Sequence, residues 1–390
     1  MSIFEFYTPT HVYFGKKQEE RVGEILKQGQ YKKVLVHYGS HSAKASGLLD
    51  RVLSSLKEQN IEYVTLGGVV ANPELSKVKE GIALAKKENV DFILAVGGGS
   101  VIDSAKAIGY GVVNEGDIWD YYEKKKAVSG CLPIGAIVTI AAAGSEMSDS
   151  SVITNEDGWL KRGLSSDYAR CRFAIMNPEL TMTLPLYQTA SGATDIIMHT
   201  MERYFVKENS MDLTDQFAEG LMRTVMKHAR ILMKDPTNYE SRAEIMWAGS
   251  NAHNNVTGSG SFGDWACHQL EHELSGLYHV AHGAGLAAVW KSWAMYVYEE
   301  KVSRFAQYAR NVMGICEEDD KECAIKGILA TEAFFKEIGM PTSIHELGID
   351  LTEEDIETLA YKCSFQNTRT IGKFKVLDLE DMKEIYRMAK

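Results

Sequence analysis

The first half of the chain alternates short apolar runs with amphipathic stretches, and this alternation restricts the possible fold more than any other feature. Four runs have the length and composition of buried strands, at 32–39, 61–69, 90–99 and 131–140. Amphipathic segments at 46–60, at 73–89 and directly after Gly99 are expected to be helices. Because strands that alternate with helices form a parallel sheet covered on both faces, we expect an α/β domain.

The pattern changes near Pro185, where long helical stretches replace the strands. Residues 213–234 carry apolar side chains at helical spacing, and an apolar helix is expected to begin just after His282. The chain is therefore divided into residues 1–185 and an all-α domain over residues 186–390. The acidic run at 317–322 is expected to be a solvated surface loop.

Charge and composition exclude several classes of protein. The 390 residues carry a formal net charge of −11, which argues against binding to nucleic acid or to an anionic membrane surface. The N-terminal segment lacks the pattern of a signal peptide, and no window approaches eighteen apolar residues, so no transmembrane helix is expected. The six cysteines include no C-x-x-C pair, which favours a reducing cytoplasm.

Three consecutive glycines and a serine, Gly97–Ser100, join an expected strand to an expected helix. Glycine permits positive φ and lets the backbone approach a ligand closely. The helix N-terminus behind it offers unpaired N–H groups and the positive end of a dipole to an anion. The turn therefore predicts a diphosphate site in a nucleotide-binding domain, although an ordinary glycine-rich turn is the alternative and neither common nucleotide motif is matched.

Four of the eleven histidines fall within fifteen residues: His268, His272, His279 and His282. The first two fit H-x-x-E-H, the signature of a zinc metallopeptidase in which both histidines bind the metal and Glu271 activates water. Glu271 lies off the helix face of the two histidines by roughly 60–100°. Because a peptidase also needs no glycine-rich phosphate turn, we interpret this match as accidental.

A second pair of candidate ligands has the same i,i+4 spacing. Asp195 and His199 would lie on one face of a helix, as would His268 and His272, whose helix is expected to be interrupted at Gly276. Two such pairs, with a further histidine at the start of an expected helix, favour a metal site.

Several motifs together resemble one family. They are GGGSxxDxAK, with Asp103 and Lys106; the loop Thr139–Glu146, which ends in Gly-Ser-Glu; and the stretches GDIWDYY, SVITNEDG and WACHQLEHELSGLYHVAHGAGLA. In these motifs the chain resembles the iron-containing alcohol dehydrogenases, and among them the butanol dehydrogenase type, over essentially its whole length.

The resemblance implies a metal centre and an activity. One divalent metal, iron or zinc, would be bound by four residues: Asp195, His199, His268 and His282. His272 would stay off the metal as the catalytic proton relay, since its ordinary pKa lies near the working pH. His279 has no family role and is expected to be a surface residue or to lie behind the ligands. The metal would polarise an aldehyde oxygen while hydride passes to or from the nicotinamide.

The resemblance also implies cofactor contacts in the first domain. Gly98, Gly99, Ser100 and Asp103 would lie at the diphosphate turn, Thr139 in the loop over it, Lys161 at the ribose and Leu180 at the nicotinamide pocket. Trp265 and Phe262, just before the metal helix, would line either an apolar substrate pocket or the core. A homodimer is a further expectation of the family.

The residues after the first strand favour NADP(H) over NAD(H). An acidic residue at such a strand end commonly binds the ribose hydroxyls of NAD and repels a 2′-phosphate. No carboxylate occurs between Tyr31 and Gly47; Gly39 instead leaves room for a phosphate, Ser40 and Ser42 can donate to it, and Lys44 can supply charge. The sequence thus predicts an NADP(H)-linked oxidoreductase of primary alcohols and aldehydes. A polyol dehydrogenase of the same fold, or less plausibly a zinc peptidase, is the alternative.

Overall fold

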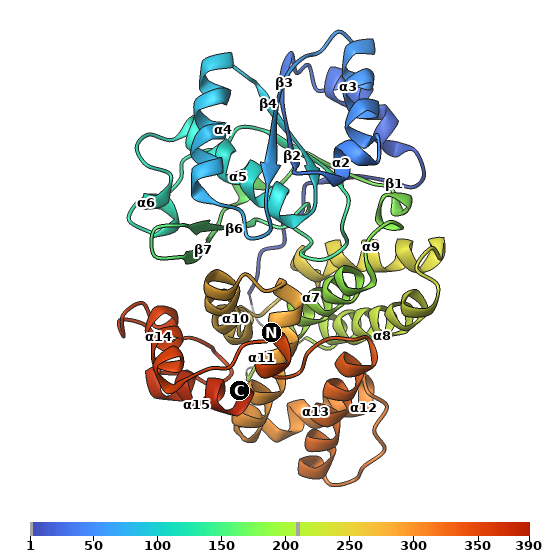
Figure 1. Ribbon diagram of the computed structural model, residues 1–390. Helices are drawn as coiled ribbons and strands as arrows, with labels where there is room; N and C mark the ends of the chain where they lie inside the picture. Colours follow the sequence, from blue (N-terminus) through green and yellow to red (C-terminus); the bar gives the residue numbers. More distant parts are fainter. Residues whose placement is uncertain (1–2, 208–210) are drawn as a thin grey trace. The chain divides into compact units, whose positions relative to one another are not determined.

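The computed structural model describes residues 3–207 and 211–390, which divide into two compact units (Figure 1). One unit is Tyr7–Thr183, and the other is Leu184–Lys390 with the described residues that precede Tyr7. Residues 3–6 therefore group with the helical unit, so a single boundary near residue 185 does not separate the two units completely. This grouping depends on contacts between residues far apart in the sequence, which a local sequence pattern cannot predict.

The unit over Tyr7–Thr183 is built on a six-stranded sheet in which every neighbouring pair is parallel, in the order β1-β8-β5-β4-β2-β3. Its strands are β1 (His11–Phe14), β2 (Lys33–Gly39), β3 (Glu62–Val69), β4 (Phe92–Gly97), β5 (Ile134–Val138) and β8 (Phe173–Met176). The predicted parallel α/β fold is confirmed. The sequence did not predict the four-residue strands β1 and β8, or the antiparallel pair β6 (Ser150–Asn155) and β7 (Leu160–Ser165).

Helices cover both faces of this sheet, because alternate strand residues are apolar on each side. They are α1 (Val22–Gln28), α2 (Ser42–Ala45), α3 (Leu48–Glu58), α4 (Leu75–Glu88), α5 (Gly99–Val113) and α6 (Trp119–Tyr122). Val34, Val36 and Leu94 pack with α1 and α3 in one buried cluster. Figure 1 shows α3 on one face and α4 and α5 on the opposite face. The helix expected at 46–60 begins only at Leu48, since Gly47 adopts a left-handed backbone.

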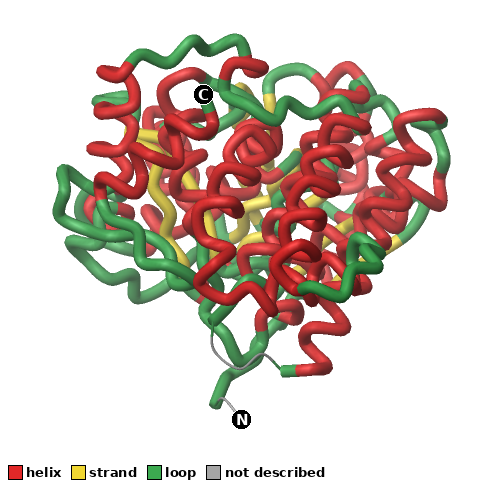
Figure 2. Tube along the Cα trace, turned by 90° about the horizontal axis from the view of Figure 1, so that it is seen from below, coloured by secondary structure: helices red, strands yellow, loops and turns green. Residues whose placement is uncertain are grey.

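The unit over Leu184–Lys390 has no strand among its described residues, and all strands of Figure 2 belong to the other unit. Its helices are α7 (Leu186–Tyr204), α8 (Asp212–Lys234), α9 (Tyr239–His253), α10 (Ala266–Tyr278), α11 (His282–Val297), α12 (Val302–Asn311), α13 (Asp320–Glu337), α14 (Glu353–Cys363) and α15 (Leu379–Ala389). The predicted all-α character is confirmed.

Two local expectations in this unit were wrong. Gly276 does not interrupt its helix, because α10 continues to Tyr278 and ends at the left-handed His279. The acidic run 317–322 is not wholly a loop, since α13 begins at Asp320 with the Asp319 carboxylate accepting a hydrogen bond from the Glu322 backbone nitrogen.

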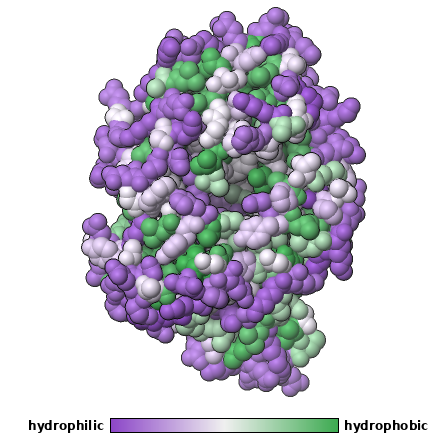
Figure 3. Space-filling view, in the orientation of Figure 1, coloured by the Kyte–Doolittle hydropathy of each residue, from purple (hydrophilic) through white to green (hydrophobic). Residues whose placement is uncertain are grey.

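Hydrophilic residues cover most of the face in Figure 3, and apolar residues occur there in scattered groups. Among the described residues, no helix combines the length and the apolar character that crossing a membrane requires.

Candidate metal centre and nucleotide edge

Three helices of one unit bring the predicted metal ligands together. Asp195 and His199 lie one turn apart on α7, His268 lies in the first turn of α10, and His282 begins α11. The Asp195 Oδ1 atom is 3.3 Å from His199 Nδ1, 3.8 Å from His268 Nε2 and 3.7 Å from His282 Nε2. Tetrahedral donors around a zinc-like ion lie about 3.4 Å apart, so these spacings match a metal site.

Three of the four residues form a group compact enough to hold an ion: Asp195, His268 and His282. His199 contacts the carboxylate but is not a member of that group. Asp195 Oδ1, His199 Nδ1 and His268 Nε2 are all buried and have no hydrogen-bond partner among the described residues. Since leaving a buried polar atom unsatisfied costs about 1–3 kcal/mol, a bound cation would stabilise this arrangement.

Two buried glutamates orient the histidines. Glu202 Oε1 accepts hydrogen bonds from the backbone nitrogen and from Nδ1 of His268, each at 2.9 Å. Glu271 Oε2 accepts a hydrogen bond from His282 Nδ1. In both rings the other nitrogen is left to face Asp195, which is how carboxylates position metal-binding histidines in proteins.

Sequence reasoning assigned no role to Glu202 and discounted Glu271. The available signal was spacing, since Glu202 follows Asp195 by two helical turns on α7, and Glu271 follows His268 by about one turn on α10. Glu271 therefore belongs to the site as the acceptor for His282, a role that sequence reasoning did not assign to it.

The electrostatics of the site favour a positive charge. Burial lowers the pKa of His268, but the neighbouring carboxylates of Asp195 and Glu202 outweigh burial and raise that pKa to about 9. Burial, together with His253 and His268, lowers the pKa of His199 well below its usual range and keeps that ring neutral. The negative charge of three buried carboxylates, Asp195, Glu202 and Glu271, thus favours a divalent cation at the imidazole and Asp195 donors.

Two glycines let α11 approach its neighbours closely. A Cβ atom on Gly283 would lie 2.0 Å from the Ser191 carbonyl oxygen of α7, and one on Gly285 would lie 2.8 Å from the Glu271 side chain. Side chains at these positions would displace the helix that carries His282, so the Gly-Ala-Gly segment is what allows the three helices to meet.

His272 lies next to His282, outside the group formed by Asp195, His268 and His282. Its half-buried ring is 5.7 Å from the ring of His282, centre to centre, and it forms a second compact group with Glu271 and His282. Among the described residues, no compact group of this kind contains both His268 and His272, as a peptidase would require. His279 is exposed at the end of α10.

In the other unit, the predicted nucleotide residues lie at the carboxyl edge of the sheet. Gly39 ends β2, Gly97 ends β4 and Thr139 directly follows β5, where its backbone nitrogen donates to the Gly97 carbonyl at 3.1 Å. The adjacent strands β2 and β4 are followed by strands on opposite sides, β3 and β5. This is the switch point at which open parallel sheets bind their ligands.

The glycine-rich turn leads into helix α5 as predicted, but the glycines are needed for a different reason than the one expected from the sequence. Gly97, Gly98 and Gly99 do not adopt positive φ, and Gly98 precedes α5 with φ −90°. A Cβ on Gly97 would lie 2.4 Å from the Val101 side chain, and one on Gly98 would lie 3.0 Å from Ile140. Close packing of the backbone, and not left-handed geometry, therefore requires glycine here.

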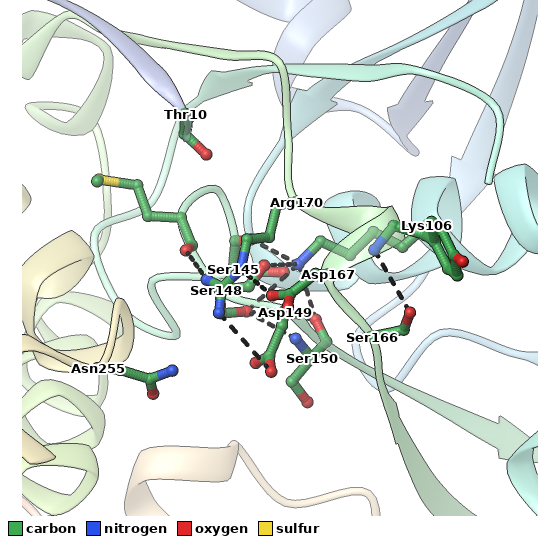
Figure 4. Close-up of polar contacts among 12 residues, drawn as sticks. Thr10, Lys106, Ser145, Ser148, Asp149, Ser150, Ser166, Asp167, Arg170 and Asn255 are labelled. Atoms are coloured by element: carbon green, nitrogen blue, oxygen red, sulfur yellow. Dashed lines mark hydrogen bonds and ion pairs between the residues drawn. The ribbon is translucent and has the colours of Figure 1, made fainter. Parts of the chain in front are cut away.

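Asp103 and Lys106 of α5 hold the chain that follows β5. The Asp103 carboxylate accepts hydrogen bonds from Ser145 Oγ at 2.5 Å and from the Val152 nitrogen at 2.9 Å. The fully buried Lys106 ammonium donates to the carbonyls of Ser145, Ser148 and Ser150 at 2.7–2.9 Å (Figure 4). Both side chains thus fix the loop after Thr139, and neither oxygen of Asp103 is left unpaired.

The remaining predicted cofactor residues lie on several elements of this unit. Gly99 and Ser100 begin α5, Ser40 and Ser42 are exposed just after β2, and Leu180 packs against the buried cluster of the sheet. The buried Lys161 of β7 donates from Nζ to Asn72 Oδ1 at 2.9 Å.

Known proteins are similar to this chain in sequence and in fold. The family model "Iron-containing alcohol dehydrogenase" matches residues 9–178, and "Fe-containing alcohol dehydrogenase family, C-terminal" matches residues 189–390. The NADH-dependent butanol dehydrogenase A of Clostridium acetobutylicum is 38% identical, with 100% of both chains covered. The NADPH-dependent aldehyde reductase of Escherichia coli is 33% identical, also with 100% of both chains covered.

Among solved structures, the NADH-dependent butanol dehydrogenase A of Thermotoga maritima has a TM-score of 0.96 and 40% identity, covering 100% of this chain and 99% of that one. Fold, sequence and site together define an oxidoreductase of alcohols and aldehydes. The chain belongs to the iron-containing alcohol dehydrogenase family, which confirms the resemblance and removes the peptidase alternative.

Proposed function

We propose that the protein interconverts primary alcohols and aldehydes with NADP(H), using one divalent metal bound by Asp195, His199, His268 and His282. The observation that carries this proposal is the set of buried donor atoms that face Asp195 without hydrogen-bond partners, backed by Glu202 and Glu271. Oxygen and imidazole donors are compatible with iron and with zinc, and the family's description favours iron.

When bound, the ion supplies Lewis acidity to the substrate oxygen. Asp195 contributes a negative donor, while Glu202 and Glu271 hold the rings of His268 and His282 so that each Nε2 faces Asp195. His272, half-buried beside His282, moves the proton that the substrate oxygen gains on reduction or loses on oxidation. The nicotinamide supplies or accepts the hydride.

The preference for NADP(H) is supported by the residues at the end of β2. Gly39 offers no side chain there, the Ser40 and Ser42 hydroxyls are exposed, and the exposed Lys44 ammonium lies 5.3 Å from the centre of the Tyr38 ring. A 2′-phosphate at this edge would meet hydroxyl donors and a cation. It would meet no carboxylate from the segment between Tyr31 and Gly47. The similar relatives include one named as NADH-dependent and one named as NADPH-dependent. The proposed preference for NADP(H) therefore rests on this chain's own residues.

The test is the absorbance of NADPH after butanal is added to protein loaded with Fe²⁺ or Zn²⁺. We expect the absorbance to fall with the loaded protein and to stay constant after the metal has been removed by a chelator. No fall with either metal and either nicotinamide would refute the proposed activity.

A further inference from the structure

The three histidines of the proposed metal set are held in two different ways. His268 and His282 each donate from Nδ1 to a buried glutamate. His199 is turned the other way, because its Nδ1 atom is the nitrogen that faces Asp195, 3.3 Å from Oδ1. Glu202 and Glu271, which hold the other two rings, are engaged with His268 and His282, so the contacts on the flat side of the His199 ring are of interest.

The flat side of His199 is covered by His253, the last residue of α9. Their ring centres are 4.1 Å apart and the planes are inclined by 36°. Trp265 continues the aromatic group, with its ring centre 5.9 Å from His253 and 6.1 Å from His199. Rings at these separations attract one another and restrict rotation about their side-chain bonds.

Trp265 has an unfavourable, left-handed backbone conformation. Its φ of 67° is left-handed, which is uncommon for a bulky residue and tends to persist only where the surroundings enforce it. Arg203 lies 4.5 Å from the centre of the indole ring, and the indole nitrogen donates to the Phe262 carbonyl at 3.1 Å. Arg203 also donates to the His199 carbonyl at 2.9 Å, so one cation joins the tryptophan to the backbone of the ligand.

We propose that His253 is a positioning residue for His199, which acts by stacking its ring on that of His199, with Trp265 as its support. The inference rests on the proposed metal function, since it assigns the stack to the orientation of a metal ligand. If stacking is the role of His253, an aromatic ring without nitrogen should replace it.

The experiment compares Co²⁺ binding by the whole protein and three variants. His253→Ala removes the stack, His253→Phe keeps a ring without nitrogen, and His345→Ala changes an exposed histidine remote in sequence as a control. Affinity and the visible absorption of bound Co²⁺ are measured, and thermal unfolding of the metal-free proteins reports their folding. We expect His253→Ala to bind Co²⁺ about 10-fold more weakly with a shifted spectrum, as supporting residues of metal sites do.

His253→Phe is expected to bind within about 3-fold of the unmodified protein with its spectrum restored, as His345→Ala should. Equal binding by His253→Ala, or an equal loss in His253→Phe, would overturn the inference, and the phenylalanine variant decides if the alanine variant does not fold. Failure of the unmodified protein to bind Co²⁺ would instead refute the proposed metal site.

Discussion

Glu202 accepts two hydrogen bonds from His268, one from its backbone nitrogen and one from its ring, both at 2.9 Å. One carboxylate oxygen therefore fixes the start of α10 against α7 and sets the direction in which the histidine ring faces. Because Glu202 is only 2% exposed, its charge acts in a medium that screens weakly. The metal set is thus assembled by residues that are not themselves its proposed ligands.

We expect Glu202→Gln to lower metal affinity about 10–100-fold, because an amide retains the size of the side chain but not the charge that orients and polarises His268. Equilibrium dialysis against Zn²⁺ measures the change. Glu354→Gln, an exposed carboxylate on α14, is the matched control. Equal affinity in the Glu202 and Glu354 variants would show that the carboxylate does not support the site.

Gly39→Asp is expected to shift the cofactor preference from NADPH toward NADH. A side chain fits at this position, since a Cβ atom would lie 3.7 Å from its nearest neighbour, the Val69 carbonyl oxygen. The new carboxylate would repel a 2′-phosphate, and we expect kcat/KM for NADPH to fall about 10-fold or more.

Gly39→Asn is the control, because it has the shape of aspartate without its charge. If NADH serves the unmodified enzyme as well as NADPH does, or if the asparagine and aspartate variants change preference alike, the charge argument for NADP(H) is wrong.

The stability of the nucleotide unit should depend on pH through His37. This ring is fully buried, with Nδ1 3.0 Å from the Leu66 carbonyl and Nε2 2.8 Å from Ser104 Oγ. Burial is the main cause that lowers its pKa to about 4. Between pH 4 and 6.5 the unfolded chain therefore binds more protons than the folded one, so stability falls as the pH is lowered through that range.

From pH 7.5 to pH 5 this single group should remove about 2 kcal/mol of unfolding free energy. Urea unfolding of the unmodified protein and of His37→Gln at both pH values measures it. The variant should lose less stability on acidification than the unmodified protein does; equal losses would show that His37 does not titrate as argued.

Much of the fold could be predicted because its signals are local. The strands β2, β3, β4 and β5 are apolar runs, and the helices between them are amphipathic, so a parallel sheet follows from their order. The strands β1 and β8 were not predicted, because each has only four residues and is defined by its pairing with a neighbouring strand. The hairpin of β6 and β7 was not predicted, because its strands are rich in polar residues.

The proposed ligands could be recognised from the spacing of chemically distinctive residues and from the family motifs. The stack of His253 and Trp265 on His199 could not be predicted, since no local pattern tells which residue such a side chain will contact; for Glu202 the only signal was its helical spacing from Asp195. The left-handed backbone of Trp265 and the stack on His199 exist only once three segments have packed together.

The measurement that tests the account most directly is the metal content and turnover of His282→Ala and His272→Ala. We expect His282→Ala to lose both metal and activity, because it removes a donor atom that faces Asp195. His272→Ala should keep its metal near the level of the unmodified protein and slow the reaction about 10²–10⁴-fold, as the loss of a proton-transfer group does. If His272→Ala lost the metal while His282→Ala retained it, the ligand assignment and the role of His272 would both be contradicted.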